Sequence, residues 1–371
     1  MKHVCCVAAV VLLLVSGFVS VALAFVPVAD ALRAVYISPD GKRIITTTLY
    51  ARLTRIWDAE TGKELARVNS DASVAFSSDG TKFTQLRGNN EVEVLETESG
   101  KSLQIFKGHT APLASATFSH DGKKIVSASE DGTVRIWDVD TGKELLKIDG
   151  HIENPSDIDK DGRVNFSDRV RFAVFSPDGK TIVTFGNRLN DAQIWDAETD
   201  SANFGKELRK LEEIPFAMNA AQVAFSPDSK KIAIWHSLAI RIWDAESGKE
   251  LQKLAEGQGH TRVRTIAFSP DGKKIVTVGD GDPTITNENY RQYITARIWD
   301  TESGKELHKL EIYAPERRID HPMTMYNIPA AAFLPDGKRI ITTYGNDIRI
   351  WDAESGEQLQ KIELQGLYRE R

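Results

Sequence analysis

Cysteine is nearly absent from the 371-residue chain, and its two cysteines, Cys5 and Cys6, both lie at the start. The remainder therefore offers no disulfide, no thiol nucleophile and no thiolate metal site. Runs of five or more like charges are also absent, and 47 lysines and arginines stand against 53 aspartates and glutamates. Without clustered cations a protein cannot displace counterions from a phosphate backbone, so no binding of nucleic acid is expected.

Long apolar runs are missing everywhere except at the beginning. Residues 1–24 have one cation, Lys2, then an apolar stretch that ends in Ala22-Leu23-Ala24. This layout predicts a secretory signal peptide cleaved before Phe25, and hence export to the periplasm or the extracellular space with no membrane contact afterwards. The alternative is an uncleaved anchor, because Val4 to Val26 is long enough to span a bilayer core of about 30 Å.

What the sequence does contain is one unit, repeated. Each copy has a Ser-Pro-Asp-Gly turn or a variant of it, then an alternating stretch that ends in Trp-Asp, then Ala-Glu-Thr/Ser-Gly-Lys-Glu-Leu or a close relative. Self-similarity at a period of roughly 40–50 residues is the signature of a repeat architecture. The Trp-Asp pairs begin at Trp57, Trp137, Trp195, Trp243, Trp299 and Trp351, and a degraded seventh copy lies at Leu95-Glu96.

Each unit predicts four short β-strands. In the third copy these are residues 114–119, 124–129, 134–138 and 144–148, joined at Asp121-Gly122, Asp131-Gly132 and Thr141-Gly142. Dipeptides of this kind between β-forming stretches are typical of hairpin turns. A four-stranded unit cannot bury both of its faces alone, so the copies must stack on one another.

These repeats resemble the WD-repeat (Trp-Asp repeat) β-propellers over nearly all of residues 31–364. The resemblance implies an all-β protein, a seven-bladed propeller of four-stranded antiparallel blades, with residues 25–371 forming one compact, monomeric domain. It also implies a buried His–Ser/Thr–Asp–Trp hydrogen-bond network that fixes blade packing. The residues that match this network are His109, Ser127, Asp131 and Trp137 in the third unit, and His260, Thr277 and Trp299 in the sixth.

Insertions distinguish some copies from the rest. Three long segments, residues 150–169, 280–295 and 311–329, replace short connections that all fall on the same side of the blades. Variable loops on a rigid scaffold commonly carry binding, so this rim is the predicted binding face for a protein partner. The alternative is that the inserts only pack onto the propeller. The side chains expected to contact a partner are Tyr290, Tyr293, Arg317, Arg318, His321 and Tyr326.

The first insert, between blades 3 and 4, contains the sequence DIDKDGRVNFSD at residues 157–168. Its oxygen ligands stand at the positions of a loop that wraps one calcium ion, with Gly162 at the sharp turn. It resembles an EF-hand loop, and the terminal aspartate is similar to that of dockerin modules. The short final ligand predicts weak affinity, about 10⁻⁴ to 10⁻³ M, and the alternative is an acidic solvated turn. The predicted ligands are Asp157, Asp159, Asp161, Arg163 through its carbonyl, Asn165 and Asp168.

Two classes of function remain. The resemblance favours an exported, non-catalytic scaffold for protein interaction, with calcium ordering one loop. The alternatives are an exported propeller hydrolase or lactonase-like enzyme, and a binder of carbohydrate or another small ligand. Quinoprotein dehydrogenases are also propellers, and their repeats have a tryptophan shortly after the Gly-Lys turn. No quinone cofactor is expected here, because that position holds Ala66, Leu146, Gln252, His308 and Gln360. No nucleotide cofactor is expected either.

Overall fold

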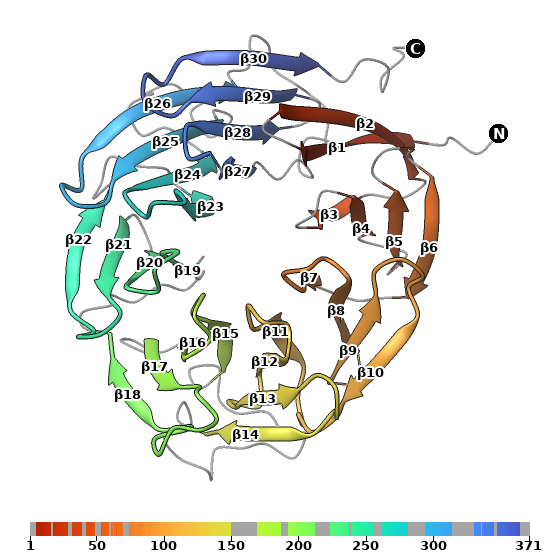
Figure 1. Cartoon of the computed structure of the whole chain (residues 1–371), viewed down its shortest axis with the longest axis vertical. Coiled ribbons are helices and arrows are strands. Elements are labelled where there is room, and N and C mark those ends of the chain that lie inside the picture. Colours follow the sequence, from red (N-terminus) through yellow and green to blue (C-terminus); the bar gives the residue numbers. More distant parts are fainter. Residues whose placement is uncertain are drawn as a thin grey trace. The chain divides into compact units, whose positions relative to one another are not determined.

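The computed structural model shows a chain built of β-strands, and no α-helix occurs among the residues that it describes (Figure 1). Within these residues no helix is long and apolar enough to cross a membrane. The described residues are 5–15, 18–28, 32–38, 42–48, 53–58, 61, 63–69, 74–88, 90–149, 169–186, 192–211, 223–236, 239–254, 262–280, 294–313, 330–334, 336–344 and 347–363.

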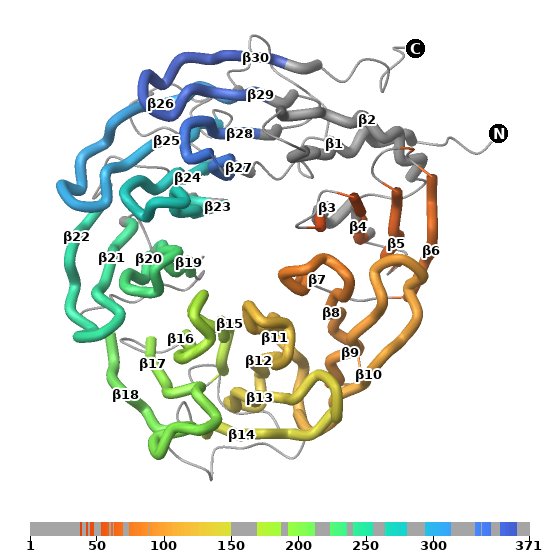
Figure 2. Tube along the Cα trace, in the orientation of Figure 1, coloured from red at the N-terminus to blue at the C-terminus, as the bar shows by residue number. Residues whose placement is uncertain are grey.

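The chain divides into two compact units, Met1–Leu208 with Gly366–Arg371, and Arg209–Gln365. The first unit contains an N-terminal pair of strands and the strands of blades 1 to 4, of which blades 2 to 4 run from orange to green in Figure 2. These are β1 (Cys5–Val15), β2 (Phe18–Val28), β3 (Leu32–Ile37), β4 (Arg43–Thr48), β5 (Leu53–Asp58), β6 (Glu64–Asn69), β7 (Val74–Phe76), β8 (Lys82–Arg87), β9 (Glu91–Glu96), β10 (Ser102–Phe106), β11 (Leu113–Phe118), β12 (Lys124–Ser129), β13 (Val134–Asp138), β14 (Glu144–Ile148), β15 (Val170–Phe175), β16 (Thr181–Gly186), β17 (Ala192–Asp196) and β18 (Glu207–Lys210), whose last two residues fall in the second unit.

The second unit contains blades 5, 6 and 7. Its strands are β19 (Val223–Phe225), β20 (Lys231–His236), β21 (Ala239–Asp244), β22 (Glu250–Leu254), β23 (Arg262–Phe268), β24 (Lys274–Asp280), β25 (Ile294–Asp300), β26 (Glu306–Tyr313), β27 (Ala330–Phe333), β28 (Arg339–Tyr344), β29 (Asp347–Asp352) and β30 (Gln358–Glu363).

Every blade is an antiparallel meander in which strands that follow one another in sequence lie side by side. In blade 3, Ser127 of β12 lies opposite Arg135 of β13, and Trp137 of β13 lies opposite Glu144 of β14. The first and last blades each hold four strands of their own, β3 to β6 and β27 to β30. Seven such sheets confirm the predicted all-β, seven-bladed propeller, whereas the single compact domain stays a prediction.

The turn between the first two strands of a blade is stabilised by its own side chains. In blade 3 the Ser119 hydroxyl donates to Asp121 Oδ1 at 2.6 Å and accepts from the Lys124 amide at 2.9 Å, while Gly122 takes a φ of 69°. Partial burial would raise the pKa of Asp121, but the hydrogen bonds from Ser119 and the Lys123 amide lower it. The same Ser–Asp hydrogen bond recurs at Ser77, Ser176, Ser226 and Ser269.

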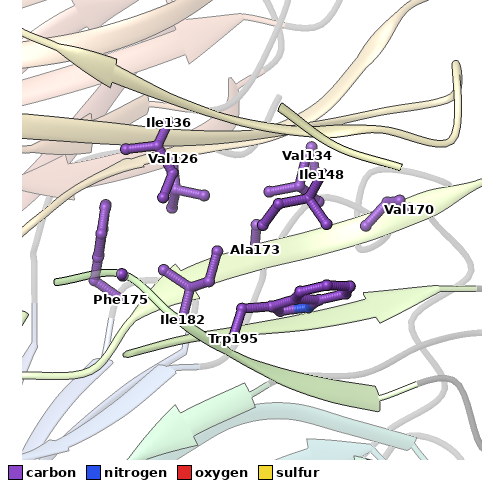
Figure 3. Close-up of a cluster of buried hydrophobic side chains, with 11 residues drawn as sticks. Val126, Val134, Ile136, Ile148, Val170, Ala173, Phe175, Ile182 and Trp195 are labelled. Atoms are coloured by element: carbon purple, nitrogen blue, oxygen red, sulfur yellow. The ribbon is translucent and has the colours of Figure 1, made fainter. Parts of the chain in front are cut away.

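The hydrophobic core lies between successive blades. Between blades 3 and 4, aliphatic side chains of β12 to β14 face Phe175, Ile182 and Trp195 of the next sheet (Figure 3). Ile182 is fully buried and Trp195 is 5% exposed. Burying a side chain of this size stabilises the fold by about 1.5–3 kcal/mol, so stacking supplies what an isolated blade lacks. The blade 3 side chains in this cluster are Val126, Ala128, Val134, Ile136 and Ile148.

A cation at the start of the second strand also joins blades to their successors. Lys124 Nζ donates to the Ala197 carbonyl at 3.0 Å, and Lys274 Nζ donates to the Ala353 carbonyl at 3.4 Å. Since each acceptor follows the Trp-Asp pair of the next blade, the repeat positions donor and acceptor together. Related contacts join Arg43 to Glu98 at 3.0 Å and Lys231 to Thr301 at 3.2 Å.

Strands β1 and β2 pair antiparallel over the predicted signal segment and beyond it, with Cys5 opposite Val28 and Val15 opposite Phe18. They form a two-stranded sheet that is separate from the blades. This pairing does not test the prediction of a cleaved signal, which stays a prediction.

The strands of blade 6 extend into two segments that the sequence assigned to insertions. Asp280 ends β24, Ile294 and Thr295 begin β25, and Tyr313 ends β26. Asp280 pairs with Ile294, which also pairs with Tyr313. The sequence assigned residues 280–295 and 311–329 wholly to loops. This assignment was wrong at the ends that lie in β24, β25 and β26, because the alternating pattern of these strands continues into the inserted segments.

Candidate functional site

The polar network of blade 3 joins two strands and the two connections beside them. His109 Nε2 lies 2.8 Å from Ser127 Oγ, and His109 Nδ1 lies 2.9 Å from Asp131 Oδ2. Trp137 Nε1 donates to the same Ser127 oxygen at 2.9 Å. The structure thus brings His109, Ser127, Asp131 and Trp137 into one hydrogen-bonded chain.

The Asp131 carboxylate is the most heavily used acceptor of this network. Its Oδ2 accepts from His109 and from the Thr110 amide at 2.9 Å, and its Oδ1 accepts from the amide and hydroxyl of Thr133 at 2.9 and 2.7 Å. Burial alone would raise the pKa of Asp131, but the hydrogen bond and charge of His109, with those of Thr133 and Thr110, lower it to about 2. Asp131 is therefore an ionised carboxylate with both oxygens occupied.

A serine, a histidine and an aspartate in this order also occur in enzymes with a serine nucleophile. Here the arrangement is closed: Ser127 is 0% exposed, and its oxygen already interacts with Trp137 and His109. His109 and Asp131 are buried as well. A nucleophile must be reachable by its substrate, so this group packs the blade and cannot act as a catalytic triad.

The hydrogen bond between the tryptophan and a hydroxyl of the second strand recurs in other blades. In blade 6, Trp299 Nε1 donates to Thr277 Oγ1 at 3.0 Å, whereas His260 lies outside the described residues. A buried indole N–H without an acceptor costs about 1–3 kcal/mol, which explains why a threonine or serine stands opposite. The same bond joins Trp57 to Thr46 at 2.9 Å, Trp195 to Thr184 at 2.8 Å and Trp351 to Thr342 at 2.8 Å.

Ion pairs between the third and fourth strands were not predicted. An arginine two residues before the tryptophan reaches a glutamate on the outermost strand: Arg241 NH1 lies 2.7 Å from Glu250 Oε2, and Arg297 NH1 lies 2.5 Å from Glu306 Oε2. The signal was present in the repeat, as Arg-Ile-Trp-Asp followed by Gly-Lys-Glu. The related pairs are Arg55 with Glu64, at 3.8 Å, and Arg135 with Glu144.

Blade 2, which lacks the histidine and the tryptophan, has a different polar network. Gln85 Nε2 donates to Glu93 Oε2 at 2.6 Å, and Arg87 NH1 lies 3.2 Å from Glu93 Oε1. On the same sheet Lys107 Nζ lies 3.0 Å from Glu91 Oε1. Both glutamates are buried, and each has a cation, so their charges are compensated within the blade.

The remaining predicted site residues lie outside the described residues. They are the calcium ligands Asp157, Asp159, Asp161, Arg163, Asn165 and Asp168, and the partner contacts Tyr290, Tyr293, Arg317, Arg318, His321 and Tyr326. In the part of the chain that the structure does describe, no group of three or more His, Cys, Asp or Glu side chains is placed to hold a metal ion.

Comparison with known proteins identifies the repeat. The family model described as "WD domain, G-beta repeat" matches residues 100–138 and 248–285. Among solved structures, the crystal structure of the computationally designed Ika8 protein matches with a TM-score of 0.63 and 20% identity, covering 90% of this chain and 87% of that one. This likeness shows the fold alone. No curated protein matches the chain in sequence.

Proposed function

Because the chain is a β-propeller that carries WD40 repeats, we propose that it is an exported, non-catalytic scaffold that binds a protein partner. The binding face is the side of the blades that carries the three inserts, and calcium orders the first of them. The propeller with its WD40 repeats supports a role in protein interaction generally. The export, the calcium loop and the lack of catalysis belong to the proposal.

One observation carries this proposal: the polar side chains that recur in the repeat form hydrogen bonds with one another within the blade. The Ser127–His109–Asp131 group is buried behind Trp137, and the turn serines and aspartates bond to one another. The Ser127–His109–Asp131 group of blade 3, which has the composition of a catalytic triad, is therefore closed to a substrate. Rigid frames of this sort favour binding through the segments that vary between copies, which are the inserts.

Export and calcium binding support each other. The Ala22-Leu23-Ala24 ending of the apolar start favours cleavage and secretion. Outside the cytoplasm calcium is present at millimolar levels, so a loop with weak affinity, such as that proposed for Asp157 to Asp168, is filled there.

The test is capture of envelope proteins by the purified chain, identified by mass spectrometry, with calcium and with chelator. Replacement of Arg317, Arg318 and Tyr326 by alanine should weaken capture of a specific partner at least several-fold. The matched control is Lys101→Ala with Lys143→Ala, two exposed lysines in the turns between the third and fourth strands of blades 2 and 3, connections that carry no insert. Equal loss of capture in both variants would refute the assignment of the binding face.

A further inference from the structure

Blades 1 and 2 pack against each other through an apolar layer. Ile45 and Ile56 of blade 1 belong to the same buried cluster as Phe83 and Leu95 of blade 2. Within each blade the two residues lie opposite one another on the second and third strands. Side chains two residues apart on a strand lie on the same face of the sheet, so the residues two positions away from this layer also face the junction.

The next layer, toward the connection between the second and third strands, is polar on both blades. Thr47 lies opposite Thr54 in blade 1, and Gln85 lies opposite Glu93 in blade 2. All four side chains are buried, with Thr54 0% and Gln85 2% exposed. The two threonines distinguish blade 1 from blades 2 to 6, in which the corresponding pair is apolar and buried. These pairs are Leu86 with Val92, Ala128 with Val134, Phe185 with Ala192, Trp235 with Ile240, and Val278 with Ala296.

Two oxygens of this polar layer need a hydrogen-bond partner. Thr54 Oγ1 and Gln85 Oε1 are both buried, and neither has a partner among the residues that the structure describes. The Gln85 amide is fixed, because its Nε2 donates to Glu93 Oε2 at 2.6 Å and turning it over would place Oε1 against the carboxylate. Buried polar groups in native proteins nearly always have a partner, so two such oxygens on facing sheets indicate a ligand between the blades.

The charges around the polar layer favour a neutral ligand. Glu93 Oε2 accepts from Gln85, and Glu93 Oε1 lies 3.2 Å from Arg87 NH1. Since this carboxylate already has a cation, a further cation beside it would be a buried charge without a counterion. A water molecule carries no charge and can bond to both oxygens, and buried waters in proteins typically bridge polar groups that have no other partner.

We propose that a water molecule is bound between blades 1 and 2, where it donates a hydrogen bond to Gln85 Oε1 and is hydrogen-bonded to the Thr54 hydroxyl. The polar face of blade 1 then matches the polar face of blade 2, whereas the apolar pairs of blades 2 to 6 offer no hydrogen bond to such a water. The site makes this junction specific for its two blades. The inference does not depend on the scaffold function.

A crystal structure of the full chain tests the site directly. An oxygen peak within about 3.2 Å of both Thr54 Oγ1 and Gln85 Oε1 would support the proposal. A direct hydrogen bond between the two side chains, with no third atom between them, would overturn it. An anomalous peak at this position after a soak in thallium acetate would also overturn it, because thallium replaces a monovalent cation and not a water.

Melting temperatures measured by calorimetry test the hydroxyl in solution. Thr54→Val keeps the shape of the side chain but removes a partner of the water, so the melting temperature should fall by roughly 1–4 °C. The matched control is Thr46→Val on the neighbouring strand, which removes the acceptor of Trp57 Nε1 at 2.9 Å and should lower the melting temperature by a similar amount. If Thr46→Val has this effect and Thr54→Val melts at the same or a higher temperature, the proposal is wrong, because valine has then replaced a hydroxyl without a partner.

Discussion

Replacement of Asp131 by asparagine tests the network that holds blade 3. The carboxylate receives two donors on each oxygen: His109 and the Thr110 amide on one, and the amide and hydroxyl of Thr133 on the other. Asparagine has nearly the same shape, but whichever way its amide turns, an NH₂ group faces two donors. Hydrogen bonds to a charged group contribute about 1.5–3 kcal/mol each, so the loss of two predicts a destabilisation of about 3–6 kcal/mol near neutral pH.

The pH dependence adds a second, independent quantity. The folded protein lowers the pKa of Asp131 from 3.8 to about 2. A lowered pKa stabilises the fold at every pH above the unfolded value, and this stabilisation is lost as the pH falls through the folded value. At about 1.4 kcal/mol per pKa unit, the ionised carboxylate contributes about 2.5 kcal/mol, of which roughly 1 kcal/mol is gone by pH 3. The asparagine of the variant does not titrate, so the gap between the two proteins should narrow by that amount.

The assay is denaturant unfolding of the unaltered chain and Asp131→Asn at pH 7, 5, 4 and 3. Asp121→Asn serves as the control, because Asp121 lies in an exposed turn and its replacement should cost less than half as much. A cost below about 0.5 kcal/mol for Asp131→Asn at pH 7, or a gap that stays constant down to pH 3, would refute the reasoning.

Two further changes have clear expected outcomes. Ser229 takes a φ of 62° at the turn position where other blades have glycine. Ser229→Gly removes the energetic cost of a left-handed backbone at a non-glycine residue but adds conformational entropy to the unfolded chain. The difference between these two effects should stabilise the protein by about 0.5–1 kcal/mol. Calorimetry should show a melting temperature higher by roughly 1–3 °C, and Gly179→Ser should lower it comparably. Millimolar calcium should raise the melting temperature of the full chain, and Asp157→Ala with Asp161→Ala should abolish the rise; an unchanged melt in the unaltered protein would contradict the calcium loop.

Most of the blade architecture was predictable because the repeat encodes it locally. Ser119, Asp121 and Gly122 make one turn almost without outside help, through a hydroxyl–carboxylate bond and a positive φ. The Trp137–Ser127 bond follows from the same logic, since a buried indole needs an acceptor on the adjacent strand. Strand lengths in blade 6 were less predictable, because the pairing of Ile294 with Tyr313 depends on two segments that are distant from each other in the sequence.

Blade 2 shows what the repeat alone could not reveal. The sequence shows that Leu95 replaces the tryptophan and that no histidine precedes it, which by itself suggests a weakened copy. In the structure Gln85 stands where blade 3 has Ser127, and Glu93 stands where blade 3 has Arg135. Gln85 and Arg87 both contact Glu93, so the charge at the arginine position is inverted and its cation comes from the second strand instead of the third. Glu93 alone would destabilise a blade of the standard kind, since a buried carboxylate without a partner is strongly unfavourable. Together the substitutions are compatible, and only the three-dimensional arrangement shows that compensation across strands stabilises blade 2.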